Sequence, residues 1–231
     1  MKITEIVGGQ CIWLLPPRDT SKTDTVRALK ILRAIEERYG FLQAPRMLAD
    51  YDFQKGVTFT FGQFHNDWII EKLQIFNNGI LVEAKTETSK IESFLDEIID
   101  WAIAEFDVKF PAEKFLGRAY LSQFEIHVDM NLGELFAQFS ECGGFITECL
   151  NAYGLNSPSY EAVQLTMFGD ITKVTSPHPG SSFTFERRMA KPFSSNLYYS
   201  SAPLRSEDHI KALEMLLIAF GLKKSVASLQ R

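Results

Sequence analysis

The stretch WIIEKLQIFNNGILVEAK (Trp68–Lys85) decides the fold class, because it reads as two β-strands joined by a tight turn. Asn78-Gly79 is the strongest short signal for a two-residue hairpin turn. A turn at that dipeptide predicts these facing pairs: Ile75 with Val82, and Gln74 with Glu83. Alternation predicts an apolar face formed by Leu73, Ile75, Val82 and Ala84, and a polar face formed by Lys72, Gln74, Glu83 and Lys85.

Further strands and helices are predicted on both sides of this hairpin. Strand-like runs cover residues 3–15, 57–64, 118–130, 161–168, 183–189 and 197–202. Helical periodicity covers residues 24–39, 89–106, 131–154 and 206–220. Ser89 and Ser206 are predicted to cap the helices that they open, and Gly143-Gly144 to kink the third helix.

Strands interrupted by single helices are typical of an α+β fold, with antiparallel or mixed sheets and helices packed on one face. Two blocks, about 57–106 and 160–220, each contain three strands and a helix, and they indicate two related βββα blocks. No stretch is rich enough in Gly, Ser or Pro to separate domains. We therefore predict one elaborated α+β domain over residues 1–231, with sub-blocks over 1–155 and 156–231.

The composition favours a folded, acidic protein. Hydrophobic residues make up 45% of the 231 residues and the net charge is −5. Such a charge gives no basic field, so we do not expect a nucleic-acid partner. No apolar run approaches the length of a membrane span, and the first 17 residues lack the features of a signal peptide. We expect a soluble, cytoplasmic protein with no membrane partner.

An acidic residue before Glu83-x-Lys85 raises the possibility of metal-dependent chemistry. With the order helix, three strands, helix, strand over residues 24–130, it resembles the restriction-endonuclease-like nucleases of the PD-(D/E)xK type. The resemblance implies two carboxylates that hold a divalent ion and a lysine near the attacking water. Strand alternation, however, places Asp67 on the face opposite Glu83, and only a sharp bend near Glu71 would bring the two acids together.

Two other groups of residues are candidates for a binding site. Glu125, His127 and Asp129 share one face of a predicted strand, and carboxylates with an imidazole could bind a transition metal. Side chains two residues apart lie about 6 to 7 Å from each other on a strand, so a single ion would also need a partner strand. Arg187 shares a face with two phenylalanines, and with Arg188 it is a candidate for anion binding.

The sequence contains no phosphate loop, dinucleotide fingerprint, zinc spacing or nucleophile elbow. We therefore expect a non-catalytic interaction or assembly protein, acting as a homo-oligomer or as a subunit of a protein complex, with no cofactor. The first alternative is a metal-dependent phosphoesterase or nuclease, which would use a divalent metal. The second alternative is an anion or nucleotide binder centred on Arg187 and Arg188.

Overall fold

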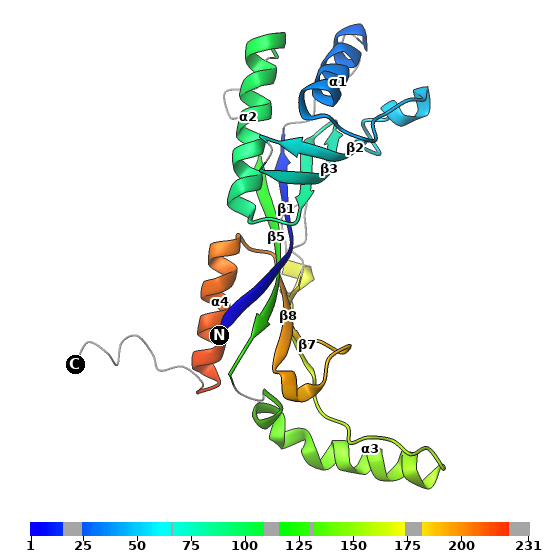
Figure 1. The fold of residues 1–231 in the computed structure, drawn as a ribbon, viewed down its shortest axis with the longest axis vertical. Coiled ribbons are helices and arrows are strands. Elements are labelled where there is room, and N and C mark those ends of the chain that lie inside the picture. The colour runs from blue at the N-terminus through cyan, green and yellow to red at the C-terminus, as the bar shows by residue number, and fades with distance from the viewer. Residues whose placement is uncertain (16–24, 66, 109–115, 130–131, 174–181, 222–231) are drawn as a thin grey trace, which may run out of the picture.

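A computed structural model describes residues 1–15, 25–65, 67–108, 116–129, 132–173 and 182–221 (Figure 1). The strands are β1 (Lys2–Leu14), β2 (Val57–Phe64), β3 (Trp68–Phe76), β4 (Gly79–Ala84), β5 (Gly117–His127), β6 (Gln164–Met167), β7 (Phe183–Arg187) and β8 (Leu197–Ala202). The α-helices are α1 (Thr25–Tyr39), α2 (Thr88–Phe106), α3 (Ser140–Ala152) and α4 (Ser206–Ala219). Short 3-10 helices are η2 (Leu48–Tyr51), η3 (Leu132–Phe139), η4 (Ile171–Lys173) and η5 (Phe193–Ser195).

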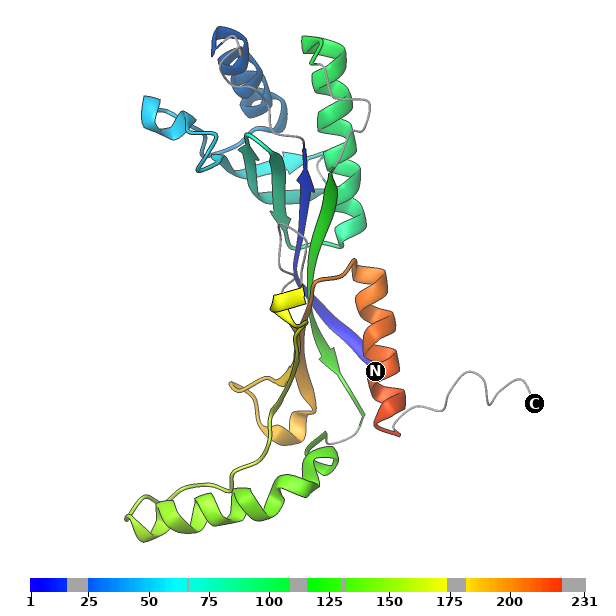
Figure 2. The ribbon, with the colours of Figure 1, turned by 180° about the vertical axis from the view of Figure 1, so that it is seen from behind.

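The eight strands form one antiparallel sheet in the order β2-β3-β4-β1-β5-β8-β7-β6. The two longest strands, β1 and β5, pair at its centre. Figure 2 shows α2 and α4 end to end along these two strands. The α+β class with an antiparallel sheet is therefore confirmed. Among the described residues, no helix has the length and apolar character needed to span a membrane.

The helices α2 and α4 lie on the same face of the sheet. A Cβ added to Gly9 would lie 3.0 Å from Cδ1 of Ile91, which belongs to α2. On the neighbouring strand, the Ser122 hydroxyl contacts the ring of His209, which belongs to α4. Gly9 and Ser122 are direct cross-strand partners, and such partners face the same side of a sheet. The predicted packing of helices on one face thus holds for these two helices.

The two halves of the sheet repeat one pattern of pairing. Six consecutive pairs join β1 to β4, from Gly9 with Ala84 to Leu14 with Gly79. Six consecutive pairs join β5 to β8, from Ser122 with Ala202 to His127 with Leu197. Just beyond these pairs, the N–H of Leu15 donates to the carbonyl of Asn78, and the N–H of Val128 donates to that of Asn196. The order strand, helix, three strands, helix therefore occurs twice, over 2–106 and 117–219.

This repeat defines equivalent positions in the two halves. Gly9 corresponds to Ser122, Val82 to Ser200 and Ala84 to Ala202. The helices α2 and α4 begin four residues after their respective alanines, so Thr88 corresponds to Ser206 and Ile91 to His209. The described residues form two separate apolar clusters, one around α1 and α2 and the other around α4.

The predicted hairpin forms, but its register differs from the prediction. The turn residues are Asn77 and Asn78, and β3 pairs Leu73 with Val82 and Lys72 with Glu83. Gly79 belongs to β4, where an added Cβ would lie 2.8 Å from the carbonyl oxygen of Trp13. The glycine therefore permits close packing with β1, which local turn signals do not report. The shift is of two residues, so the predicted polar and apolar faces are preserved.

The predicted helix caps are also corrected. α2 begins at Thr88 with Glu87 as its N-cap, so Ser89 lies inside the helix. Ser206 is the first residue of α4, and its Oγ accepts a hydrogen bond from the N–H of Thr88 at 3.0 Å. In return, Oγ1 of Thr88 accepts one from the N–H of Ser206 at 2.9 Å. Each helix thus caps the other, and this buried contact fixes the two helices end to end.

Candidate interaction surface

The residues of the nuclease-like pattern are held by separate partners. Oε1 of Glu83 accepts hydrogen bonds from Nε2 of Gln10 at 2.7 Å and Nζ of Lys72 at 3.3 Å. Lys85 lies 4.0 Å from Glu71 in an exposed ion pair. Asp67 precedes β3 and pairs with Lys90 of α2 at 3.2 Å. Ile70 and Leu73 of β3 are both buried although they are three residues apart, so the alternation of inward and outward side chains shifts between them. Asp67 and Glu83 nevertheless contact different partners, and their carboxylates do not form one site.

The row on β5 is likewise divided among different contacts. Oε2 of Glu125 accepts a hydrogen bond from Nε of Arg188 at 2.9 Å. Nδ1 of His127 lies 3.4 Å from Asp129, whose side chain is largely exposed. Within the described part of the chain, no group of three His, Cys, Asp or Glu side chains could hold a metal ion.

Arg187 is buried at the end of β7. Its guanidinium donates to the backbone carbonyl of Phe193 at 3.1 Å. The guanidinium carbon also lies 4.4 Å from the centre of the aromatic ring of Phe193. Its second terminal nitrogen lies 3.7 Å from Oε2 of Glu161. The neighbouring Arg188 pairs with Glu125, as described above. Both guanidinium groups of the anion-site hypothesis are therefore engaged by acidic side chains of the chain itself.

A buried serine-histidine-serine cluster joins β5, β8 and α4. Oγ of Ser122 lies 2.8 Å from Nδ1 of His209, and Oγ of Ser200 lies 2.9 Å from Nε2. Ser200 donates its hydroxyl hydrogen to the carbonyl of Thr184, so Nε2 of the imidazole donates to Ser200. In a neutral imidazole with its proton on Nε2, Nδ1 accepts a hydrogen bond from the hydroxyl of Ser122. Burial lowers the pKa of His209 from 6.5 to about 4, which keeps it neutral at physiological pH.

All three members of this cluster are fully buried, and the His209 ring stacks on Phe124 with 4.8 Å between ring centres. The equivalent positions in the first half hold Gly9, Val82 and Ile91. A substrate could not reach the cluster without unfolding this part of the core. The cluster is therefore a structural element of the second half rather than a catalytic site.

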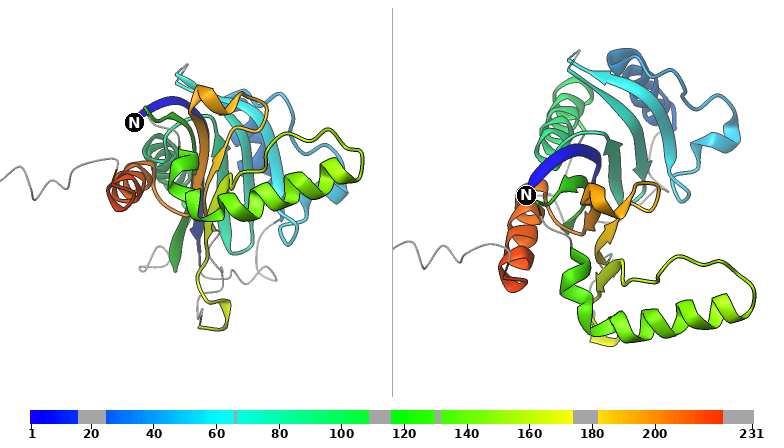
Figure 3. Two further views of the ribbon diagram at one scale, coloured as in Figure 1. Left: turned by 90° about the horizontal axis from the view of Figure 1, so that it is seen from below. Right: turned by 60° about the horizontal axis from the view of Figure 1, so that its bottom comes forward.

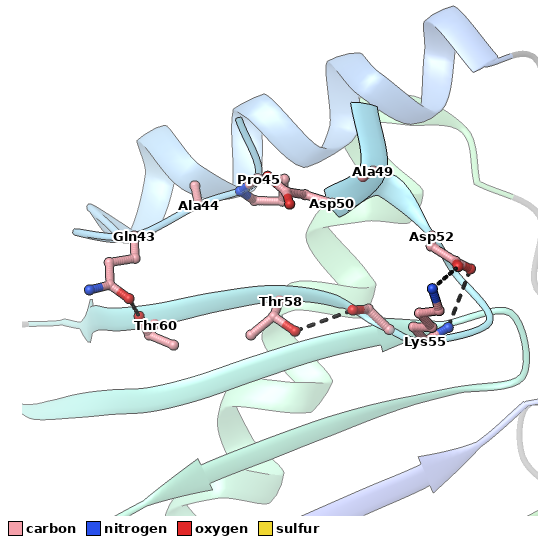
Figure 4. A pocket seen from close by; sticks show the side chains of 10 residues that line it. Gln43, Ala44, Pro45, Ala49, Asp50, Asp52, Lys55, Thr58 and Thr60 are labelled. Carbon is pink, nitrogen blue, oxygen red and sulfur yellow. Dashed lines mark hydrogen bonds and ion pairs between the residues drawn. The ribbon is translucent and has the colours of Figure 1, made fainter. Parts of the chain in front are cut away.

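A polar hollow lies between β2 and the segment that follows α1 (Figure 4). Its volume is about 320 Å³, and its walls include Gln43, Asp50, Asp52, Lys55, Thr58 and Thr60. Backbone N–H groups hydrogen-bond both aspartates and lower the pKa of each. Oγ1 of Thr60 donates to Oε1 of Gln43 at 2.9 Å. Both carboxylates accept hydrogen bonds from backbone N–H groups of the turns in this segment. The hollow therefore does not bring reactive groups together.

Among the residues that the structure describes, many exposed apolar side chains belong to an arm, which we define as residues 139–168. Figures 1 and 3 show that its helix α3 extends away from the sheet. The exposed apolar side chains of the arm are Phe139, Phe145, Ile146, Tyr153, Leu155, Tyr160, Met167 and Phe168. Single exposed apolar residues are ordinary, whereas a contiguous exposed apolar patch is typical of an interaction site.

The arm has an ordered internal structure. A Cβ added to Gly143 would collide with the carbonyl oxygen of Tyr160, so the returning chain packs directly on α3. The N–H of Tyr160 donates to Oγ1 of Thr147 at 3.1 Å, and that of Ser157 donates to Oδ1 of Asn151. α3 is continuous over Ser140–Ala152, which corrects the predicted kink at Gly143-Gly144. The exposed apolar side chains of the arm therefore belong to a segment with defined internal contacts.

The charge of the arm is one-sided. Residues 119–172 contain seven Asp and Glu residues and no Lys or Arg. Any ion pair that the arm makes with another surface must therefore use a cation from that surface.

Comparison with models of protein families finds no family that matches the chain, and comparison with curated proteins finds no match.

Proposed function

We propose that the protein is a non-catalytic interaction protein whose arm, residues 139–168, is the surface through which it associates with a protein partner or with itself. The observation that carries this proposal is the exposure of large apolar side chains along an ordered helix. Tyr153 is 74% exposed and Leu155 is 57% exposed, and both lie directly after α3.

Burial of the exposed apolar side chains of the arm would contribute free energy to association. Complete burial of a large apolar side chain contributes about 1.5 to 3 kcal/mol, and the arm leaves several such side chains in contact with water. An ordered, exposed set of this kind is stabilised by association, because burial of the set adds to the free energy of binding. The candidate polar residues support the same conclusion, since each is engaged within the chain.

The experiment compares three forms of the full chain as immobilised bait. These are the natural sequence, an arm variant with Phe145→Ser, Tyr153→Ser and Leu155→Ser, and a control with Leu48→Ser and Ile69→Ser. The control residues are equally exposed but lie at the other end of the sheet. Each bait is offered an untagged copy of the chain and a lysate of the source cells.

We expect the natural sequence and the control to retain a common partner, and the arm variant to lose it. Circular dichroism checks that the three forms share one secondary structure content. Retention of the same partner by the arm variant would contradict the proposal, and so would the absence of any retained protein or copy.

A further inference from the structure

The helix α3 repeats the apolar pattern of α1. Both helices connect the first and second strands of a half, and both end in Tyr-Gly with a glycine at positive φ, 59° at Gly40 and 82° at Gly154. The N–H of Phe41 donates to the carbonyl of Glu36, and the N–H of Leu155 donates to that of Leu150. These identical end structures align the two helices residue by residue.

The alignment pairs buried residues of α1 and the turn after it with accessible residues of α3 and the turn after it. The pairs are Leu32 with Ile146, Ile35 with Cys149, Tyr39 with Tyr153, and Phe41 with Leu155. Tyr39 is 4% exposed and Phe41 is 5% exposed, against 74% and 57% for their counterparts. α3 therefore carries a set of side chains that, in the first half of the same fold, is used to dock a helix.

The place where α1 docks is formed by α2 and β2. Tyr39 packs edge-on against Phe94 and Trp101, with ring centres 5.0 and 6.5 Å apart. Phe41 packs against Phe59 of β2, with ring centres 5.2 Å apart. This contact closes the first apolar cluster over the edge of the sheet.

The second half has an equivalent surface, formed by α4 and β6, which we call the α4 slot. Counting along the equivalent strands and helices gives Leu165 for Phe59, Ala212 for Phe94, Met215 for Glu97 and Ala219 for Trp101. Met215 and Ala219 are exposed and Leu165 is half-buried. The alanines replace large aromatic rings, so a helix could approach α4 closely.

Charge matches α3 to the α4 slot. In the first half, the guanidinium of Arg38 on α1 pairs with Glu97 of α2 at 2.8 Å. The equivalents of these two residues are Ala152 on α3 and Met215 on α4. α3 contains no Lys or Arg, and the α4 slot has Met215 at the position that Glu97 occupies on α2. The two changes are complementary, because a carboxylate facing an alanine would lose its partner.

We propose that α3 of each chain docks in the α4 slot of a second copy, so that two copies exchange their arms. This inference rests on the proposed function and names its partner. The returning chain packs on α3 through the contacts of Gly143 and Thr147 with Tyr160, and Figures 1 and 2 show α3 directed away from the α4 of its own chain. A reciprocal exchange satisfies both arms and both slots, and such a two-fold contact closes into a dimer.

The test forms a disulfide between α3 and the slot. Cys142 and Cys149 are first replaced by Ser and Ala, whereas Cys11 stays because its thiol is buried and burial raises its pKa. One chain then carries Ala152→Cys and a second carries Met215→Cys. Neither chain can form this pairing alone, so a disulfide between the two chains in a mixture reports a contact between copies.

We expect mild oxidation of the mixture to give a covalent dimer with a 152–215 linkage in at least tenfold excess over a control. The control mixes Ala152→Cys with Met189→Cys, a residue that is as exposed as Met215 but lies outside the slot. Two results would overturn exchange between copies. One is an internal disulfide in a doubly substituted chain with no dimer in the mixture, which would indicate that α3 folds back on its own slot.

The other contrary result is a mixture that forms no more dimer than the control. If the variant with Phe145→Ser, Tyr153→Ser and Leu155→Ser fails to retain a different protein that the natural sequence retains, the proposed function stands. Only the identity of the partner is then wrong. If the arm variant loses nothing, both proposals fail. The two experiments together therefore separate the partner from the function.

Discussion

Replacing the buried serine-histidine-serine cluster by its first-half counterpart tests whether the two halves are structurally equivalent. The perturbation is the triple substitution Ser122→Gly, Ser200→Val and His209→Ile, which copies Gly9, Val82 and Ile91. Because the first half packs these three residues in the same register, we expect the triple variant to fold with a stability within about 1.5 kcal/mol of the natural chain.

The single substitution His209→Ala should behave very differently. It leaves a cavity beside Phe124 and removes a partner from each of two buried hydroxyls. Loss of a large buried side chain costs about 2 to 5 kcal/mol, and each hydroxyl left without a partner adds to that cost. We therefore expect His209→Ala to lower the free energy of unfolding by at least about 3 kcal/mol.

The pH dependence of stability supplies a second readout. The pKa of His209 is about 4 in the folded chain and 6.5 in its ordinary environment. Between these values the unfolded chain binds a proton that the folded chain excludes. The free energy of unfolding therefore falls as the pH drops from 6.5 towards 4, by about 3 kcal/mol in total. This contribution is complete above pH 6.5 and absent from the triple variant.

Urea denaturation at pH 7.5, 6, 5 and 4.5, followed by circular dichroism, measures both effects. His127→Asn serves as the control histidine, because His127 lies on the opposite face of β5 and is only half-buried. The equivalence of the halves would be refuted by a triple variant as unstable as His209→Ala. The assignment of the neutral imidazole would be refuted if the triple variant kept the acid sensitivity of the natural chain.

Three further predictions can be checked by thermal or chemical denaturation. Thr88→Val and Ser206→Ala should each cost about 1 to 2 kcal/mol, and the double variant should cost less than their sum, because the two residues cap each other's helices. Gly144→Ala should stabilise the chain by up to about 1 kcal/mol, since an added Cβ meets nothing within 4 Å, whereas Gly143→Ala should loosen the arm and expose it to protease. Millimolar manganese, magnesium or zinc should leave the melting temperature unchanged, because the acids around His127 are divided among separate partners; a rise of several degrees would restore the metal hypothesis.

The sequence predicted the α+β class and the boundaries of most elements because those depend on local periodicity. It placed the polar and apolar faces of the hairpin correctly for the same reason. It misplaced the turn because Gly79 is required by the neighbouring strand, 66 residues earlier at Trp13, and not by a turn at positive φ. Long-range packing of that kind leaves no local signature.

The candidate site was less accessible to sequence reasoning. The patterns around Glu83, Glu125 and Arg187 suggested chemistry, yet each residue is engaged by a partner from a distant strand or loop. One signal for the arm was present in the sequence, namely the repeat of Tyr-Gly followed by an apolar residue at 39–41 and 153–155. The different environments of α1 and α3 depend on tertiary packing, which that motif does not encode.

The division of the chain into sub-blocks over 1–155 and 156–231 stays a prediction. The repeated pairing pattern instead groups β5 and α3 with the strands that follow them. Limited proteolysis of the segments between the repeats would show whether either group is stable alone.

Light scattering of the full chain as it elutes from a size-exclusion column tests the exchange of arms most directly, because it measures the mass of the particle. The mass of one chain is 26.3 kDa. The account predicts a mass of twice that value at micromolar concentration, and a return to 26.3 kDa when Tyr153 and Leu155 are replaced by serine. A natural chain that stays at the mass of one copy at every concentration would contradict the exchange of arms, and so would a dimer that survives both substitutions.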